Sequence, residues 1–169
     1  QGQQWAYMGR QLYETEDVFK SSVDECDQIF KKVSGWSLLN DEGLFAKYFN
    51  GKVCNAVSVM NNLEVSQPSI LFLQIAYAKL LQHWGIIPDV VVGHSLGEVA
   101  AAYVSGGMTL EESIRVIYIR SVEQGKLKGT GSMAALRMSA DEASVLCSKY
   151  DRLYIAAYNA PGSVTIAGN

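Results

Sequence analysis

The spacing of apolar residues divides the chain into a helical first part and a mixed second part. Apolar side chains recur three and four positions apart over residues 15–33, 66–85 and 110–121, and this period predicts three amphipathic helices. A shorter helical pattern begins at Trp5. Ser66-Gln67-Pro68 is expected to open the second of the long helices, and Thr109 with Glu112 is expected to form a capping box at the start of the third.

Residues 132–169 follow a different pattern, after a glycine-rich linker at 125–131. The pattern predicts a strand at 132–138, a helix at 140–150 and strands at 153–158 and 163–167, with a turn at 159–162. This β-α-β-β order begins a ferredoxin-like α+β unit, which needs one more helix and strand. We therefore expect residues 1–128 to form one domain and residues 129–169 the incomplete beginning of a second.

A strand, a tight turn and a helix are expected in the middle of the chain. Val90-Val91-Val92 predicts a short buried strand, and Glu98 onward predicts a helix rich in small residues. Gly93-His94-Ser95-Leu96-Gly97 between them fits the G-x-S-x-G nucleophile elbow. So tight a reversal strains the backbone at Ser95, and glycines let the two segments approach. The alternative is that the serine occupies a purely structural turn.

Composition and charge narrow the classes of function. The 169 residues are 49% hydrophobic and 18% charged, which is typical of a globular protein. A net charge of −3 gives no basic excess, so nucleic acid is not an expected partner. Three cysteines without metal-ligand spacing indicate reduced thiols, no metal site and a cytoplasmic protein. The apolar run at 70–87 is interrupted by polar residues, so we expect a core helix and no membrane span. The abrupt ends suggest a piece excised from a longer polypeptide.

Two arginines on the third helix have different surroundings. Arg115 follows Glu111 and Glu112 at helical spacing, which predicts a surface ion pair. Arg120 lies at the edge of the apolar face, with Glu123 as its local acidic candidate. A guanidinium in that position either pairs locally or takes an anion from elsewhere, such as a substrate carboxylate.

Several motifs together resemble one enzyme family. Residues 93–98, Gly-His-Ser-Leu-Gly-Glu, are similar to the G-H-S-x-G-E signature of malonyl-CoA:acyl-carrier-protein transacylases, which include acyltransferase domains of type I polyketide and fatty acid synthases. The likeness extends over the whole chain, through residues 1–5, 67–68, 120–121, 129–135 and 159–162. It implies an α/β fold: an α/β-hydrolase-like large subdomain with a parallel sheet and a nucleophile elbow, followed by the ferredoxin-like small subdomain.

The resemblance also implies a reaction and a set of site residues. Ser95 would accept the acyl group of a malonyl-type acyl-CoA and pass it to the phosphopantetheine thiol of an acyl carrier protein, without a bound cofactor. Arg120 would bind the substrate carboxylate. Gln1 and the N–H of Leu96 would form the oxyanion hole. The neighbouring domains of a multidomain synthase would be further partners. Additional pocket positions implied by the motifs are Gln67, His94 and Asn159, although an asparagine at a turn also bonds its own backbone.

One departure from the family pattern leaves alternatives open. The family uses a histidine as general base, and the two histidines here, His83 and His94, do not match it. His83 suits the last turn of a helix, and His94 is too close to Ser95 along a sharp turn. We therefore expect the base beyond residue 169 and no turnover by this piece alone. The alternatives are a serine hydrolase and a non-catalytic part of a synthase that keeps the elbow as architecture.

Overall fold

The computed structural model describes residues 3–5, 7–39, 44, 48–49, 52–53 and 60–169. The chain divides into two compact units, Gln1–Gly125 and Lys126–Asn169. This division falls three residues before the expected boundary between 128 and 129.

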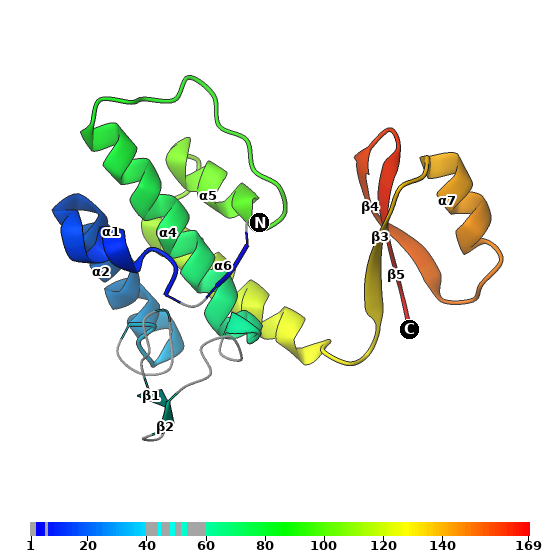
Figure 1. Ribbon diagram of the computed structural model, residues 1–169, viewed down its shortest axis with the longest axis horizontal. Helices are drawn as coiled ribbons and strands as arrows, with labels where there is room; N and C mark the ends of the chain where they lie inside the picture. The colour runs from blue at the N-terminus through cyan, green and yellow to red at the C-terminus, as the bar shows by residue number, and fades with distance from the viewer. Residues whose placement is uncertain (1–2, 6, 40–43, 45–47, 50–51, 54–59) are drawn as a thin grey trace. The chain divides into compact units, whose positions relative to one another are not determined.

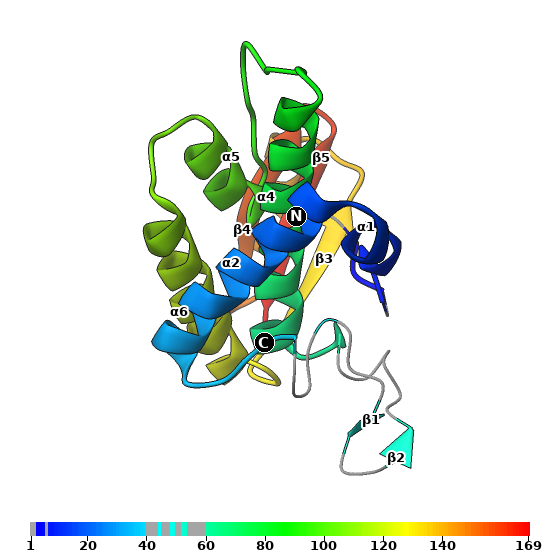
Figure 2. The same cartoon turned by 90° about the vertical axis from the view of Figure 1, so that its left-hand side faces the viewer.

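The first unit is built mainly from helices (Figures 1 and 2). The longest helix, α4, packs against α2 and α5. The elements are α1 (Arg10–Thr15), α2 (Asp17–Ser34), β1 (Tyr48–Phe49), β2 (Lys52–Val53), α4 (Leu63–His83), α5 (Gly97–Val104) and α6 (Leu110–Lys126). The three long amphipathic patterns thus correspond to α2, α4 and α6, and the first short pattern corresponds to α1, which begins later than expected.

Helix α4 begins earlier than its sequence pattern predicts. The side chain of Asn62 accepts a hydrogen bond from the Glu64 N–H at 3.0 Å and caps the helix one residue before Leu63. The expected start near Ser66 was therefore wrong, and Pro68 lies inside the helix, where its ring leaves the Glu64 carbonyl without its usual donor. As a result Gln67 lies within the helix, and it is 2% exposed.

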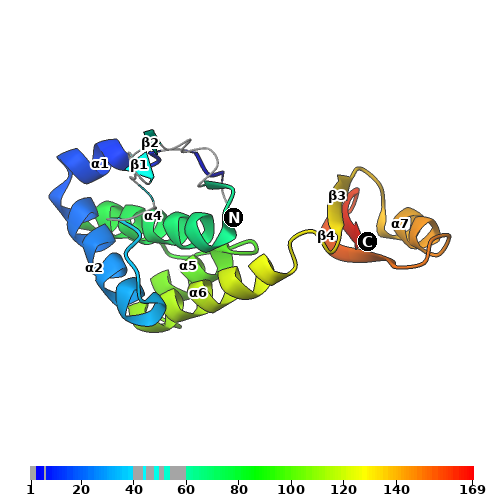
Figure 3. The same ribbon diagram turned by 90° about the horizontal axis from the view of Figure 1, so that it is seen from below.

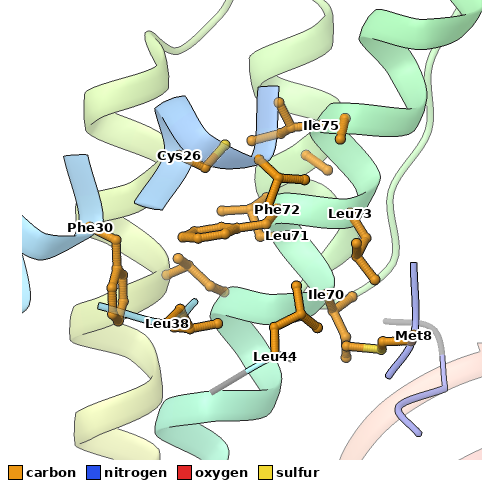
Figure 4. Close-up of a cluster of buried hydrophobic side chains, with 14 of the residues drawn as sticks. Met8, Cys26, Phe30, Leu38, Leu44, Ile70, Leu71, Phe72, Leu73 and Ile75 are labelled. Carbon is orange, nitrogen blue, oxygen red and sulfur yellow. The ribbon is translucent and has the colours of Figure 1, made fainter. Parts of the chain in front are cut away.

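The hydrophobic core of this unit lies where α2, α4 and α6 meet (Figures 3 and 4). The ring of Phe30 on α2 packs edge-on against Phe72 of α4 and Tyr118 of α6, with centroid distances of 5.8 and 5.7 Å. Such edge-to-face pairs add to the free energy gained by burying apolar surface. The core therefore holds α6 beside α4, and this packing brings Arg120 near Gln67.

The short buried strand expected at Val90–Val92 is absent, and that prediction was wrong. Residues 84–96 run as coil between α4 and α5 (Figure 1). Val90 is 85% exposed and Val92 is 94% exposed. A β-rich sequence can pair only if a neighbouring strand offers its backbone groups, and no strand described in this unit lies in register with it. The described residues thus form a mixed α and β fold without the expected parallel sheet.

The second unit has the predicted β-α-β-β order. Its elements are β3 (Ser132–Leu136), α7 (Ala140–Cys147), β4 (Leu153–Ala160) and β5 (Ser163–Gly168). The strands form an antiparallel sheet in the order β3-β5-β4, with Ala134 opposite Ile166 and Ile155 opposite the same residue. A two-residue turn at Pro161 and Gly162 joins β4 to β5. Proline fixes φ at the first turn position, and Gly162 does not take the positive φ that a type II turn would require at the second.

Candidate active site

The backbone around Ser95 has the strained geometry expected of a nucleophile elbow. Ser95 has φ 56°, a left-handed value that non-glycine residues rarely adopt. A Cβ atom at Gly93 would collide with the backbone of Gly97 and Glu98, because the incoming chain passes against the first turn of α5. The predicted strain at the serine and the predicted need for glycine at 93 are confirmed.

The first turn of α5 directly follows the serine. Glu98 N–H donates to the Ser95 carbonyl at 3.1 Å, and Val99 N–H donates to the Leu96 carbonyl at 3.1 Å. Leu96 is buried and anchors the turn in the core. Among the described residues the Leu96 N–H has no hydrogen-bond acceptor, as is usual for the first donors of a helix. The start of α5 therefore offers a free backbone donor next to Ser95.

Arg120 of α6 lies against the serine hydroxyl, although 25 positions separate the two residues in sequence. Its Nη2 donates to Ser95 Oγ at 3.0 Å. Both side chains are half-buried. Because a guanidinium only donates hydrogen bonds, the serine oxygen acts as acceptor in this contact. The packing of α6 thus brings a permanent positive charge to the elbow.

Gln67 and Gln124 complete a chain of side-chain hydrogen bonds behind the arginine. Arg120 Nη1 donates to Gln67 Oε1 at 2.6 Å, and Gln67 Nε2 donates to Gln124 Oε1 at 2.6 Å. Gln67 was expected near the pocket from its motif, whereas Gln124 was not singled out by the sequence. Its one signal is the four-residue spacing from Arg120, which places both on the same face of α6.

The partners of Arg120 are electrically neutral. Its described hydrogen bonds go to an amide oxygen and a hydroxyl oxygen. The described salt bridges include Arg10 with Glu14, Lys20 with Asp24 and Lys79 with Glu25, and none of those described involves Arg120. The ion pair expected for Arg115 is also absent there, because Glu112 instead accepts from Thr109. The charge of a half-buried guanidinium that donates only to neutral oxygens is not neutralised, so the group can still bind an anion.

The two histidines of this unit have different surroundings. His83 ends α4 and is exposed, as its sequence position suggested. His94 lines an apolar cavity of about 480 Å³ between the end of α4, residues 86–93 and α5. Ser95 does not line this cavity, and its hydroxyl accepts a hydrogen bond from Arg120. The side chains of His94 and Ser95 therefore face different parts of the unit.

Two further site residues, Asn159 and Gln1, were predicted from their motifs. Asn159 belongs to the second unit, where its Nδ2 donates to Thr165 Oγ1 at 2.9 Å across the hairpin. The turn role considered for Asn159 was wrong, because the residue lies in β4 and the turn follows it. Gln1 lies outside the described residues. In the parts of the chain that are described, no cluster of three or more His, Cys, Asp or Glu residues could hold a metal ion, and no helix is long and apolar enough to cross a bilayer.

Comparisons with known proteins show to which family the chain is similar. A family model described as "Acyl transferase domain" matches residues 1–169. "Probable polyketide synthase 1" of Dictyostelium discoideum is 38% identical over 170 residues, which cover 100% of this chain and 5% of that protein. The chain therefore corresponds to a small part of this curated relative.

Two solved structures have a similar fold, and the chain covers about half of each. A loading acyltransferase from the avermectin modular polyketide synthase is 34% identical with a TM-score of 0.82, covering 99% of this chain and 52% of that one. A malonyl-CoA:ACP transacylase of Synechocystis is 26% identical with a TM-score of 0.76, covering 100% of this chain and 52% of that one. Together with the elbow and its arginine, the full-length family match shows that the chain belongs to the acyl transferase domain family.

Proposed function

We propose that this chain provides the nucleophile and the carboxylate clamp of an acyltransferase domain that loads a malonyl-type unit in a polyketide synthase. The observation that carries the proposal is the 3.0 Å contact between Arg120 Nη2 and Ser95 Oγ. It places a cation beside a serine held in the strained elbow conformation. The names of the related proteins, which include polyketide synthases and a malonyl-CoA:ACP transacylase, support the same reaction class.

The first half-reaction forms an ester on Ser95. Its Oγ attacks the thioester carbonyl of the acyl-CoA, the hydroxyl proton passes to a general base, and the coenzyme A thiolate leaves when the carbon–sulfur bond breaks. The Leu96 N–H at the start of α5 stabilises the negative charge on the carbonyl oxygen, and Gln1 supplies the second donor. In the second half-reaction the phosphopantetheine thiol of an acyl carrier protein attacks the ester and releases Ser95.

Arg120 selects an acyl group with a carboxylate. In a malonyl ester the carboxyl carbon is three bonds from the serine oxygen, so its oxygens can reach a guanidinium that contacts Oγ. The carboxylate replaces neutral acceptors with charged ones, and hydrogen bonds to charged groups are about twice as strong as neutral ones. An acetyl group has no such partner. The arginine therefore favours dicarboxylic acyl units.

The general base is assigned to neither histidine of this chain. The described hydrogen bond of Ser95 goes to Arg120, which remains protonated and cannot accept a proton. His83 lies at the far end of α4, and His94 lines the apolar cavity. A histidine outside this chain, as the resemblance implies, completes the site.

We further infer that residues 126–169 begin a ferredoxin-like subdomain. The strand order β3-β5-β4 with α7 between β3 and β4 is the order of the first three strands of that unit. Asn159 lies in β4 of this unit, and the family resemblance of its motif implies a position near the acyl pocket of the complete domain.

Acylation by a panel of acyl-CoAs tests the proposal. The full-length protein, meaning the longer protein that includes this chain and the proposed general base, would be mixed with malonyl-CoA, methylmalonyl-CoA or acetyl-CoA. Acyl-Ser95 would be followed by intact mass. We expect no acylation of Ser95→Ala. Arg120→Ala should lower kcat/KM for malonyl-CoA roughly 10- to 150-fold relative to acetyl-CoA, from the strength of hydrogen bonds to a charged group. An unchanged preference between the two substrates would show that Arg120 does not bind the carboxylate.

A further inference from the structure

We propose that Gln124 is a positioning residue for the substrate carboxylate, which acts by orienting the Gln67 amide and through it the Arg120 guanidinium. The inference rests on the proposed function, because it concerns the geometry of the same carboxylate clamp. Gln124 belongs to none of the motifs that indicated the active site. It would not touch the substrate, and its effect passes through two other side chains.

The geometry of the hydrogen-bond chain supports this role. Gln124 and Arg120 are four residues apart on α6, so both face α4, and Gln67 of α4 bridges them. The two bridging contacts are each 2.6 Å, and the contact of Arg120 with Ser95 Oγ is 3.0 Å. The position of Arg120 is thus defined by one bond to the nucleophile and one bond to Gln67.

The polarity of these groups determines which atom of each must face its neighbour. A guanidinium offers five donors and no acceptor, so Gln67 must present Oε1 to Arg120. The Gln67 amide then directs its NH₂ group away from Arg120, toward Gln124. Gln124 must therefore present its side-chain oxygen as the acceptor for the Gln67 NH₂ group. If the Gln67 amide rotated by half a turn, two donors would face each other at Arg120 and the contact would become repulsive.

Burial makes this arrangement sensitive to Gln124. Gln67 is 2% exposed, and a buried amide hydrogen without a partner is costly. Once the Gln124 oxygen is removed, the Gln67 amide gains by turning toward any other acceptor, and this movement takes Oε1 away from Arg120. Gln124 is itself exposed, so its truncation opens no cavity in the core. Its replacement therefore perturbs the clamp and leaves the fold intact.

The test measures the preference for malonyl-CoA over acetyl-CoA in the full-length protein. Gln124→Ala removes the acceptor, whereas Gln124→Glu keeps an oxygen facing Gln67. Gln28→Ala is the matched control, because Gln28 is an exposed glutamine on α2 with no described side-chain hydrogen bond. We expect Gln124→Ala to lower the ratio of the two kcat/KM values roughly three- to tenfold, the loss of about one neutral hydrogen bond. Gln124→Glu should restore the ratio, and Gln28→Ala should leave it unchanged.

Combination with Arg120→Ala separates this inference from the proposed function. In the Arg120→Ala background we expect Gln124→Ala to have no further effect on the ratio. If Arg120→Ala lowers the ratio and Gln124→Ala does not, the positioning role is overturned and the carboxylate clamp stands. An equal loss with both substrates, or a failure of glutamate to restore the ratio, also overturns the positioning role. If Arg120→Ala leaves the ratio unchanged, both proposals fall.

Discussion

Gly93 is the position at which one added methyl group should disturb the elbow most. In Gly93→Ala the new Cβ would lie inside 3.0 Å of three backbone atoms, which belong to Gly97 and Glu98. Backbone atoms cannot rotate away as a side chain can. One of these atoms, the Glu98 nitrogen, is also held by a first hydrogen bond of α5, which its N–H donates to the Ser95 carbonyl at 3.1 Å. The loop and the helix start must therefore move apart.

The magnitude follows from this forced displacement. Overpacking of this kind costs about 1–3 kcal/mol of the free energy of unfolding. The movement also shifts Ser95 relative to Arg120, and a displacement of about 1 Å at a reacting group can lower the rate on the order of 100-fold. We therefore expect Gly93→Ala to lose more in the rate of Ser95 acylation than in stability.

The assay compares two glycine-to-alanine variants at either end of α5. Single-turnover acylation by malonyl-CoA would be followed by intact mass, and stability would be followed by denaturant unfolding of the same protein. Gly107→Ala is the control, since its Cβ would meet the Ala102 carbonyl oxygen at an ordinary 3.4 Å. The reasoning fails if Gly93→Ala acylates as fast as Gly107→Ala and unfolds at the same denaturant concentration.

Two further predictions concern groups whose pKa values depart from their ordinary range. The Glu112 carboxylate accepts hydrogen bonds from the backbone N–H and the hydroxyl of Thr109. These bonds, the backbone one most strongly, hold the pKa of Glu112 below the ordinary 4.5. This capping box therefore stabilises the fold above the unfolded pKa, and the stabilisation is lost as the pH falls through the lower folded value. In denaturant unfolding at pH 7 we expect Glu112→Gln to be less stable than wild type, with the difference closing toward pH 3, whereas a constant difference would contradict the box. Burial raises the pKa of the Cys26 thiol to about 12, so at pH 8 iodoacetamide should label the half-buried Cys147 well before Cys26, as read by peptide mass. Labelling at equal rates in the native protein would contradict this burial, and denaturation should equalise the two.

The local features of this chain were predictable because their causes lie within a few residues. The helical period of residues 15–33 is sufficient to place α2, and the Thr109–Glu112 box forms as its spacing predicts. The strain at Ser95 follows from a serine between two glycines ahead of a helix. The start of α4 was misplaced because Ser66 and Asn62 both suit a cap, and packing of the next turn into the core decides between them.

The features that only the tertiary structure decides all depend on partners that are distant in sequence. The valines at 90–92 have the propensity of a strand, but a strand exists only where another chain segment supplies its hydrogen bonds, and propensity carries no information about that neighbour. The contact of Arg120 with Ser95 spans 25 positions, and the bond from Gln67 to Gln124 spans 57. Both arise from the packing of α6 beside α4 around Phe30. The sequence alone therefore determined the nucleophile elbow and the helices, while the folded core determined which charge faces the serine and which amide holds that charge in place.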